Sequence, residues 1–343
     1  MKKVLKFLIT LAIGFFIFWL VLKRVGLSSL NESLSLFLSF KGLILIILTF
    51  IAVLMGVWKW KSILASYGLR IPFKKLIDLW LVDFGVSYLT PIAFVGGEAI
   101  RIYFTGKRFN VPWEKSTASV IVDRILDATL VLMFIISGLL FFVFYGYFPS
   151  RIIFTLEILI IGALSALLLF FYSKALNRKS ALKWFFKLFG IKKEKIENSE
   201  NGKIIFETER EVMEFFNLKR KSFWKALGLG YLRYLLLFFR TTLLIFFIKQ
   251  GIEIPKALAI YGFVNGSMLF PVPAAVGTLE TISAFGFSSF GLGGANGVTF
   301  AMVFRSTDLV VCLSGLFFLI KHGAEIAEMK ILEISDKFFR NFR

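Results

Sequence analysis

Long apolar runs constrain this chain more than any other feature of its sequence. Six of them lie at about 4–22, 43–58, 118–147, 152–172, 223–248 and 298–320. Most approach or exceed the ~18–20 residues that a helix needs to cross the hydrocarbon of a bilayer. They are continuous in Leu, Ile and Phe, whereas the strands of a membrane barrel alternate apolar and polar residues. The sequence therefore predicts an all-α polytopic membrane protein with six transmembrane helices.

The composition agrees with this class and explains the charge. Hydrophobic residues make up 57% of the chain, and the mean hydropathy is +0.79. A formal net charge of +19 would suggest nucleic acid as the partner of a soluble chain. In a membrane protein, Lys and Arg instead collect in cytoplasmic loops and face anionic lipid headgroups. We therefore expect anionic membrane lipids, and no nucleic acid, as partners.

Basic residues also predict the orientation and the division of the chain. Lys2, Lys3 and Lys6 precede or begin the first run, which places the N-terminus of a multi-pass cell (inner) membrane protein in the cytoplasm. The C-terminus is expected on the same side. The predicted parts are a first membrane half at 1–172, a cytoplasmic basic connector at 173–222, a second membrane half at 223–321 and an interfacial amphipathic helix at 322–343.

Two stretches repeat one charged pattern within apolar surroundings. In each, a Glu is followed after 26 or 25 residues by an Arg and, three residues later, by an Asp. The residues are Glu98, Arg124 and Asp127 in the first stretch, and Glu280, Arg305 and Asp308 in the second. The repeat predicts that the two membrane halves are related units.

Each charged pattern begins in an apolar segment that polar, Gly and Pro residues interrupt. The interruptions are Asp83, Pro91, Gly96 and Gly97 within 76–97, and Asn265, Pro271, Pro273 and Gly277 within 257–280. Pro removes a backbone hydrogen bond, and an unpaired carboxylate in hydrocarbon costs about 3 kcal/mol or more. Such segments survive only where they pack inside protein or line a wet cavity. We interpret both as re-entrant segments.

The charge of residues 98–117 favours re-entry over crossing. Four basic side chains lie there against Glu98 and Glu114. A full crossing at 76–97 would place this basic loop outside, against the preference of such loops for the cytoplasm. With 76–97 entering from inside and 257–280 from outside, the halves form two inverted repeats. Broken segments that meet near the midplane are common in transporters of this architecture.

Arg124 and Arg305 are the main candidates for binding a lipid phosphate, because guanidinium groups bind phosphate bidentately. Arg101 is a third candidate, with a loop-end anchor as its alternative role. An arginine inside a helix bundle needs a partner. The carboxylates expected to pair with these arginines or to gate the site are Glu98, Asp123, Asp127, Glu280 and Asp308. Each half would then hold a Glu–Arg–Asp cluster.

Other groups around the clusters have more than one possible role. Backbone N–H groups near Gly96, Gly97 and Gly277 are expected to contribute to an anion-binding nest. Arg233 and Arg240 are expected to pair locally or to line the cavity. In the alternative interpretation, all of these ion pairs only fix the register of the helices.

Four motifs carry a family resemblance: GGEAIR at 96–101, VDRILD at 122–127, PVPAAVGTLE at 271–280 and FRSTD at 304–308. They resemble the transmembrane region of lysylphosphatidylglycerol synthases, a flippase-like family with many stand-alone members. The resemblance extends from the first helix to about residue 320. Ala274 and Ala275 depart from it, because glycines are common at these positions. The soluble aminoacyl-transfer domain of the full-length synthases has no counterpart here, so the resemblance implies lipid translocation without lipid modification.

We therefore expect an integral membrane flippase or transporter that moves an anionic phospholipid or a polyprenyl-phosphate-type lipid between leaflets. It is expected to be no enzyme and to need no cofactor or metal. The sequence contains no D-x-D nucleotide-sugar motif, P-loop or HExxH motif. The alternative is a membrane scaffold or subunit for a separate lipid-modifying or lipid-linked glycosyl-transfer enzyme.

Overall fold

The computed structural model describes residues 28–89, 96–144, 151–188, 200–249, 251–270, 272 and 275–340. Every regular element in these ranges is a helix, which confirms the all-α prediction. The predicted first span at 4–22 and the residues Pro91, Pro271 and Pro273 lie outside the described ranges.

The helices are grouped by the predicted division into two membrane halves and a connector, a division that stays a prediction. The first half contains α2 (Ser28–Phe37), α3 (Phe40–Ser66), α4 (Phe73–Leu89), α5 (Glu98–Phe109), α6 (Trp113–Phe144) and α7 (Arg151–Leu176). The connector contains α8 (Ala181–Leu188) and α10 (Glu200–Phe215). The second half contains α11 (Lys221–Lys249), α12 (Ile254–Ser267), α13 (Thr278–Ser289) and α14 (Gly294–Arg340).

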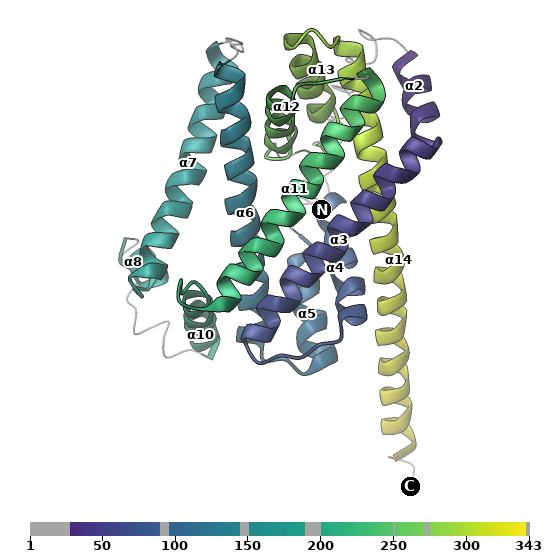
Figure 1. The fold of residues 1–343 in the computed structure, drawn as a ribbon. Helices are drawn as coiled ribbons and strands as arrows, with labels where there is room; N and C mark the ends of the chain where they lie inside the picture. The colour runs from purple at the N-terminus through teal and green to yellow at the C-terminus, as the bar shows by residue number, and fades with distance from the viewer. Residues whose placement is uncertain are drawn as a thin grey trace.

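Five helices in the described part of the chain are long and apolar enough to cross a membrane. They are α3, α6, α7, α11 and the first part of α14, Gly294–Lys321. All five run from one end of the bundle toward the other (Figure 1). The chain is therefore a multi-pass α-helical membrane protein.

Two pairs of short helices enter the bundle without crossing it. α4 has 17 residues and α12 has 14. At 1.5 Å per residue they extend ~25 and ~21 Å, less than the ~30 Å of a hydrocarbon core. In Figure 1, α4 and α5 enter from the lower end of the bundle and return to it, whereas α12 and α13 do the same at the upper end. The interrupted segments thus lie in two hairpins of opposite direction.

Each hairpin packs against the long helix of the opposite half. α4 packs against α14, α12 packs against α6, and α3 packs against α11. Glycines allow the closest approach: a Cβ on Gly138 of α6 would lie 2.7 Å from the Cα of Gly262 on α12, and one on Gly315 of α14 would overlap the carbonyl oxygen of Leu81 on α4. Small residues serve helix packing in membranes because close van der Waals contact drives it. The two halves are therefore interlocked.

The connector packs onto the membrane helices at the lower end of the bundle (Figure 1). α10 packs against α6 and α7 and buries Val212 and Phe215, and Phe216, directly after the helix, is buried as well. Tyr67, which follows α3, donates its hydroxyl to the carbonyl of Glu211 at 3.1 Å, and burial raises the pKa of its phenol. α14 continues unbroken to Arg340 and projects beyond the other helices in Figure 1. That residues 322–343 lie on the membrane surface stays a prediction.

Candidate functional site

Charged side chains gather in two clusters inside the bundle. The first cluster is Lys59, Asp83, Glu98, Arg101, Asp123, Arg124, Asp127 and Arg233, from α3, α4, α5, α6 and α11. The second cluster is Arg240, Glu280, Arg305 and Asp308, from α11, α13 and α14. Each cluster holds as many cations as anions. Neither therefore places a net charge in the membrane when all of its groups are ionised.

Arg124 lies where the first hairpin meets α6. Its Nη2 is 2.8 Å from both carboxylate oxygens of Asp83, and its Nε is 2.8 Å from Oε1 of Glu98. The predicted contact between Glu98 and Arg124 therefore forms. The Arg124 side chain is still 29% exposed. A guanidinium with an accessible side and exchangeable carboxylate partners is suited to binding an incoming anion.

Arg101 lies in the closed interior of the first cluster, and its phosphate-binding role stays a prediction. Its side chain is fully buried, with Nη1 3.0 Å from Asp83 and Nη2 2.8 Å from Asp123. The guanidinium also lies 4.4 Å from the ring centroid of Trp60. Because it is fully buried, this guanidinium offers no exposed side to an incoming anion in this structure, unlike Arg124. Arg101 instead links α5 to α4 and α6.

Asp127 does not pair with Arg124 in the described structure, contrary to the expected Glu–Arg–Asp cluster. It accepts from Nζ of Lys59 at 2.7 Å, and the same Nζ lies 2.9 Å from Asp123. Three residues along a helix correspond to a rotation of about 60° from the starting direction. Arg124 can therefore face the hairpin while Asp127 faces α3 and α11. Asp123 is buried between Lys59 and Arg101, so it belongs to the packed part of the cluster.

Arg233 joins the first cluster from the second half of the chain. Its Nη1 is 3.3 Å from Oδ1 of Asp127, and its guanidinium lies 5.2 Å from the ring of Trp80 and 5.4 Å from that of Tyr234. The local pairing expected for Arg233 is therefore present, and it connects the two halves.

Arg305 pairs with the glutamate of the second hairpin, as Arg124 does with the glutamate of the first. Its Nη1 is 2.6 Å from Oε1 of Glu280, and its Nη2 donates to Oε2 of Glu280 at 2.9 Å and to the carbonyl of Ala275 at 2.8 Å. Glu280 is fully buried, whereas Arg305 is 17% exposed. Ala275 has φ 49°, a left-handed conformation that favours glycine. This is one of the two positions where the chain departs from the glycines of the family pattern.

Asp308 pairs with Arg240 and not with Arg305 in the described structure, which corrects the second expected Glu–Arg–Asp cluster. Nη1 of Arg240 is 2.9 Å from Oδ1 of Asp308 and donates to Oγ1 of Thr49 at 2.8 Å. The guanidinium lies 4.2 Å from the ring centroid of Phe304. As in the first half, the Asp of the Arg-x-x-Asp pair faces a cation on a neighbouring long helix.

The glycine N–H groups of both hairpins are used by the chain itself. Gly96 donates to Oε2 of Glu98 at 2.6 Å, and Gly277 donates to Oε2 of Glu280 at 2.9 Å. Gly97 donates to the hydroxyl of Ser87 at 3.0 Å. Each glutamate therefore connects an arginine with a backbone N–H at the break. This donor set is the kind that binds a phosphate.

Lys59 is the group that sequence reasoning missed. It lies between Trp58 and Trp60, and a Lys beside Trp is typical of an anchor at the membrane interface, yet its side chain is fully buried. The repeat contained the signal, because Lys59 and Arg240 are 181 residues apart, like Arg124 and Arg305. Asp83 does more than interrupt an apolar segment, because it pairs with both Arg101 and Arg124. Its counterpart Asn265 donates only to the carbonyl of Tyr261, at 2.8 Å, in the described hydrogen bonds.

Comparison with known proteins places this chain in a class of membrane proteins. The family model described as the lysylphosphatidylglycerol synthase TM region matches residues 7–315. The chain belongs to this family.

Relatives among curated proteins are membrane proteins of archaea. A UPF0104 membrane protein of Methanocaldococcus jannaschii is 25% identical over 243 residues, which cover 68% of this chain and 70% of that protein. A UPF0104 membrane protein of Pyrococcus horikoshii is 33% identical over 100 residues, or 29% of this chain and 30% of the relative. One of Methanothermobacter thermautotrophicus is 28% identical over 129 residues, or 36% and 38%.

Proposed function

We propose that this protein moves an anionic phospholipid or a polyprenyl-phosphate-type lipid between the leaflets of the membrane. One observation carries the proposal. In each half, a glutamate occupies a donor set made of an arginine and the backbone N–H of a hairpin break. The two sets lie in hairpins that enter from opposite ends of the bundle (Figure 1). They would serve the same phosphate group from the two sides of the membrane.

Exchange of carboxylate for phosphate is the step that this geometry supports. A lipid phosphate offers the same charge-assisted acceptors as Glu98 or Glu280. The arginine would then keep a partner throughout, which avoids the large penalty of a buried unpaired charge. Glu98 is 19% exposed and can turn toward water when displaced, whereas Glu280 is fully buried and would need the second hairpin to move.

Reconstitution in proteoliposomes tests the proposal directly. The variant Arg124→Lys/Arg305→Lys keeps both positive charges but loses the forked geometry. We expect it to fold and to lose most of the flipping of a fluorescent phosphatidylglycerol and of a polyprenyl phosphate. Arg220→Lys is the matched control, because Arg220 pairs with Glu214 at 3.4 Å on an exposed surface. Undiminished flipping by the double variant would refute the proposal.

The scaffold alternative is supported by the balanced charges of the two clusters, which would also fix helix register without any transport. An assay of product formation separates the two functions. A scaffold would raise the output of a lipid-modifying enzyme in membranes and would show no flipping in pure liposomes. The proposed transporter flips lipid alone.

We also propose that both termini and the basic loops face the cytoplasm of the cell membrane, as the positive-inside rule favours. Cysteines at Lys107 and Glu253 test this orientation, because Lys107 ends the first hairpin and Glu253 precedes the second, and both are exposed. Lys107→Cys is expected to react with an impermeant maleimide only from the inside and Glu253→Cys only from the outside. Labelling of both from one side would contradict the arrangement.

A further inference from the structure

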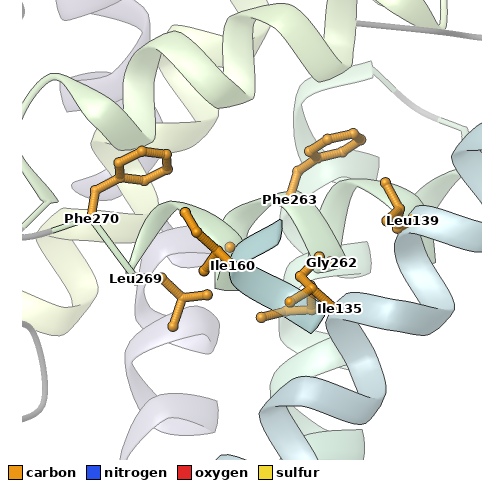
Figure 2. A pocket seen from close by; sticks show the side chains of 9 residues that line it. Ile135, Leu139, Ile160, Gly262, Phe263, Leu269 and Phe270 are labelled. Atoms are coloured by element: carbon orange, nitrogen blue, oxygen red, sulfur yellow. The ribbon is translucent and has the colours of Figure 1, made fainter. Parts of the chain in front are cut away.

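A narrow apolar crevice lies between α6, α7 and α12. Its lining includes Ile135 and Leu139 of α6, Ile160 of α7 and Gly262 of α12. Leu269 and Phe270, which follow the end of α12, complete it. Figure 2 shows Ile135, Ile160 and Leu269 around one space, with the rings of Phe263 and Phe270 along the same side of it. The crevice holds about 50 Å³, room for only a few water-sized spheres. All of the side chains that line it are apolar, so it suits neither water nor a headgroup.

One wall of the crevice is the most loosely packed span of the bundle. In the most apolar stretch of α7, within Ile158–Leu176, only 6% is buried inside the protein. Ile160, which lines the crevice, is 40% exposed, and its neighbour Leu159 is 62% exposed. Since α6 and α7 are both membrane-spanning helices, the crevice opens toward the hydrocarbon of the bilayer.

The crevice lies close in sequence to the donor set of the second half. Phe270 lines the crevice, and Ala275 accepts a hydrogen bond from Arg305 through its carbonyl. Five residues span at most about 18 Å. A hydrocarbon chain of ordinary lipid length can therefore reach from a phosphate at Arg305 to the crevice.

We propose that this crevice holds a short segment of one hydrocarbon chain of the lipid whose phosphate binds at Arg305. The inference rests on the proposed transport function and extends it, because it adds a requirement for an alkyl or prenyl chain beside the hairpin tip. Transfer of a chain from bilayer to crevice gains little hydrophobic free energy. Selection would therefore depend on shape and van der Waals contact.

Gly266 offers a way to fill the crevice without disturbing the packing. It lines the crevice, and a Cβ built on it meets no atom within 4 Å. Gly266→Leu should therefore occupy the space reserved for the chain. Gly228→Leu on α11 is the matched control, because Gly228 is also helical and has open space around its Cβ.

Photo-cross-linking in proteoliposomes tests the inference. Two probes carry the same diazirine-labelled acyl chain, one on phosphatidylglycerol and one on uncharged diacylglycerol. We expect phosphatidylglycerol to cross-link to residues 262–270 and 160–161 more than diacylglycerol does. This labelling should be lost in Gly266→Leu and kept in Gly228→Leu. Arg305→Lys should reduce the preference for the anionic probe.

Equal labelling by the two probes would mean that the crevice only takes up bulk lipid, and this would overturn the inference. Labelling elsewhere in a wild-type protein that flips lipid would refute the crevice while leaving the transport function intact. A wild-type protein that does not flip lipid would remove the transport function. In that case anion-dependent labelling, lost in Gly266→Leu, would still identify a lipid-chain site.

Discussion

The two clusters share one arrangement of charged residues and differ in the number of buried ion pairs that hold them together. Four positions keep their chemistry between the halves, at an offset of 181 or 182 residues. They are Lys59 and Arg240, Glu98 and Glu280, Arg124 and Arg305, and Asp127 and Asp308. In both halves the Glu holds the Arg, and the Asp holds the cation from a long helix packed beside it. This shared set is what a common function of the halves would require.

The first half adds a buried set of ion pairs to this arrangement, formed by Asp83, Arg101 and Asp123, which we call the lock. Arg101 and Asp123 pair at 2.8 Å, whereas Ser283 and Phe304 stand at the equivalent positions of the second half. Phe304 provides a ring for Arg240 where Asp123 provides a carboxylate for Lys59. Arg124 is held by two carboxylates, but Arg305 by one carboxylate and a carbonyl. The difference indicates that the second hairpin is the easier one to open.

The largest expected effect comes from breaking the lock of the first half. Arg101→Ala leaves Asp83 and Asp123 in a buried site with one cationic partner fewer, and removing one partner of a buried ion pair costs about 3–5 kcal/mol. We expect a large loss of thermal stability in detergent, measured by the unfolding temperature. Ser283→Ala, at the equivalent position, should change it little. Similar losses in both variants would mean that the halves are closed to the same degree.

A smaller effect should separate the two aspartates of the shared set. Asp308→Asn leaves Arg240 without its carboxylate at 2.9 Å, and a hydrogen bond to a charged group contributes about 1.5–3 kcal/mol. Asp127→Asn should cost less, because Lys59 keeps Asp123 and Arg233, at the longer distance of 3.3 Å, keeps the rings of Trp80 and Tyr234. The unfolding temperatures of the two variants in one detergent give the comparison. A greater loss for Asp127→Asn would contradict the view that the first half is the more redundant.

The sequence was enough to predict the membrane class, the two interrupted hairpins and the Glu–Arg contacts. Apolar length, Gly/Pro breaks and an internal repeat can all be recognised without knowing how the helices are placed in space. The Asp83–Arg101–Asp123 lock was not predictable, since it depends on how α4, α5 and α6 are placed in space. Lys59 and Lys61 show the same limit. They are two residues apart on α3, yet Lys59 is buried in the cluster and Lys61 lies over the ring of Phe73.

The central claim is that Glu98 and Glu280 occupy a place that a lipid phosphate can take. Native mass spectrometry of co-purified lipid tests it most directly, because the claim gives opposite signs for two double variants. Glu98→Gln/Glu280→Gln removes the glutamate charge from both arginines and should retain more anionic lipid than the wild-type protein. Arg124→Lys/Arg305→Lys should retain less. Loss of anionic lipid from both variants, or the same lipid mixture on all three proteins, would contradict the claim.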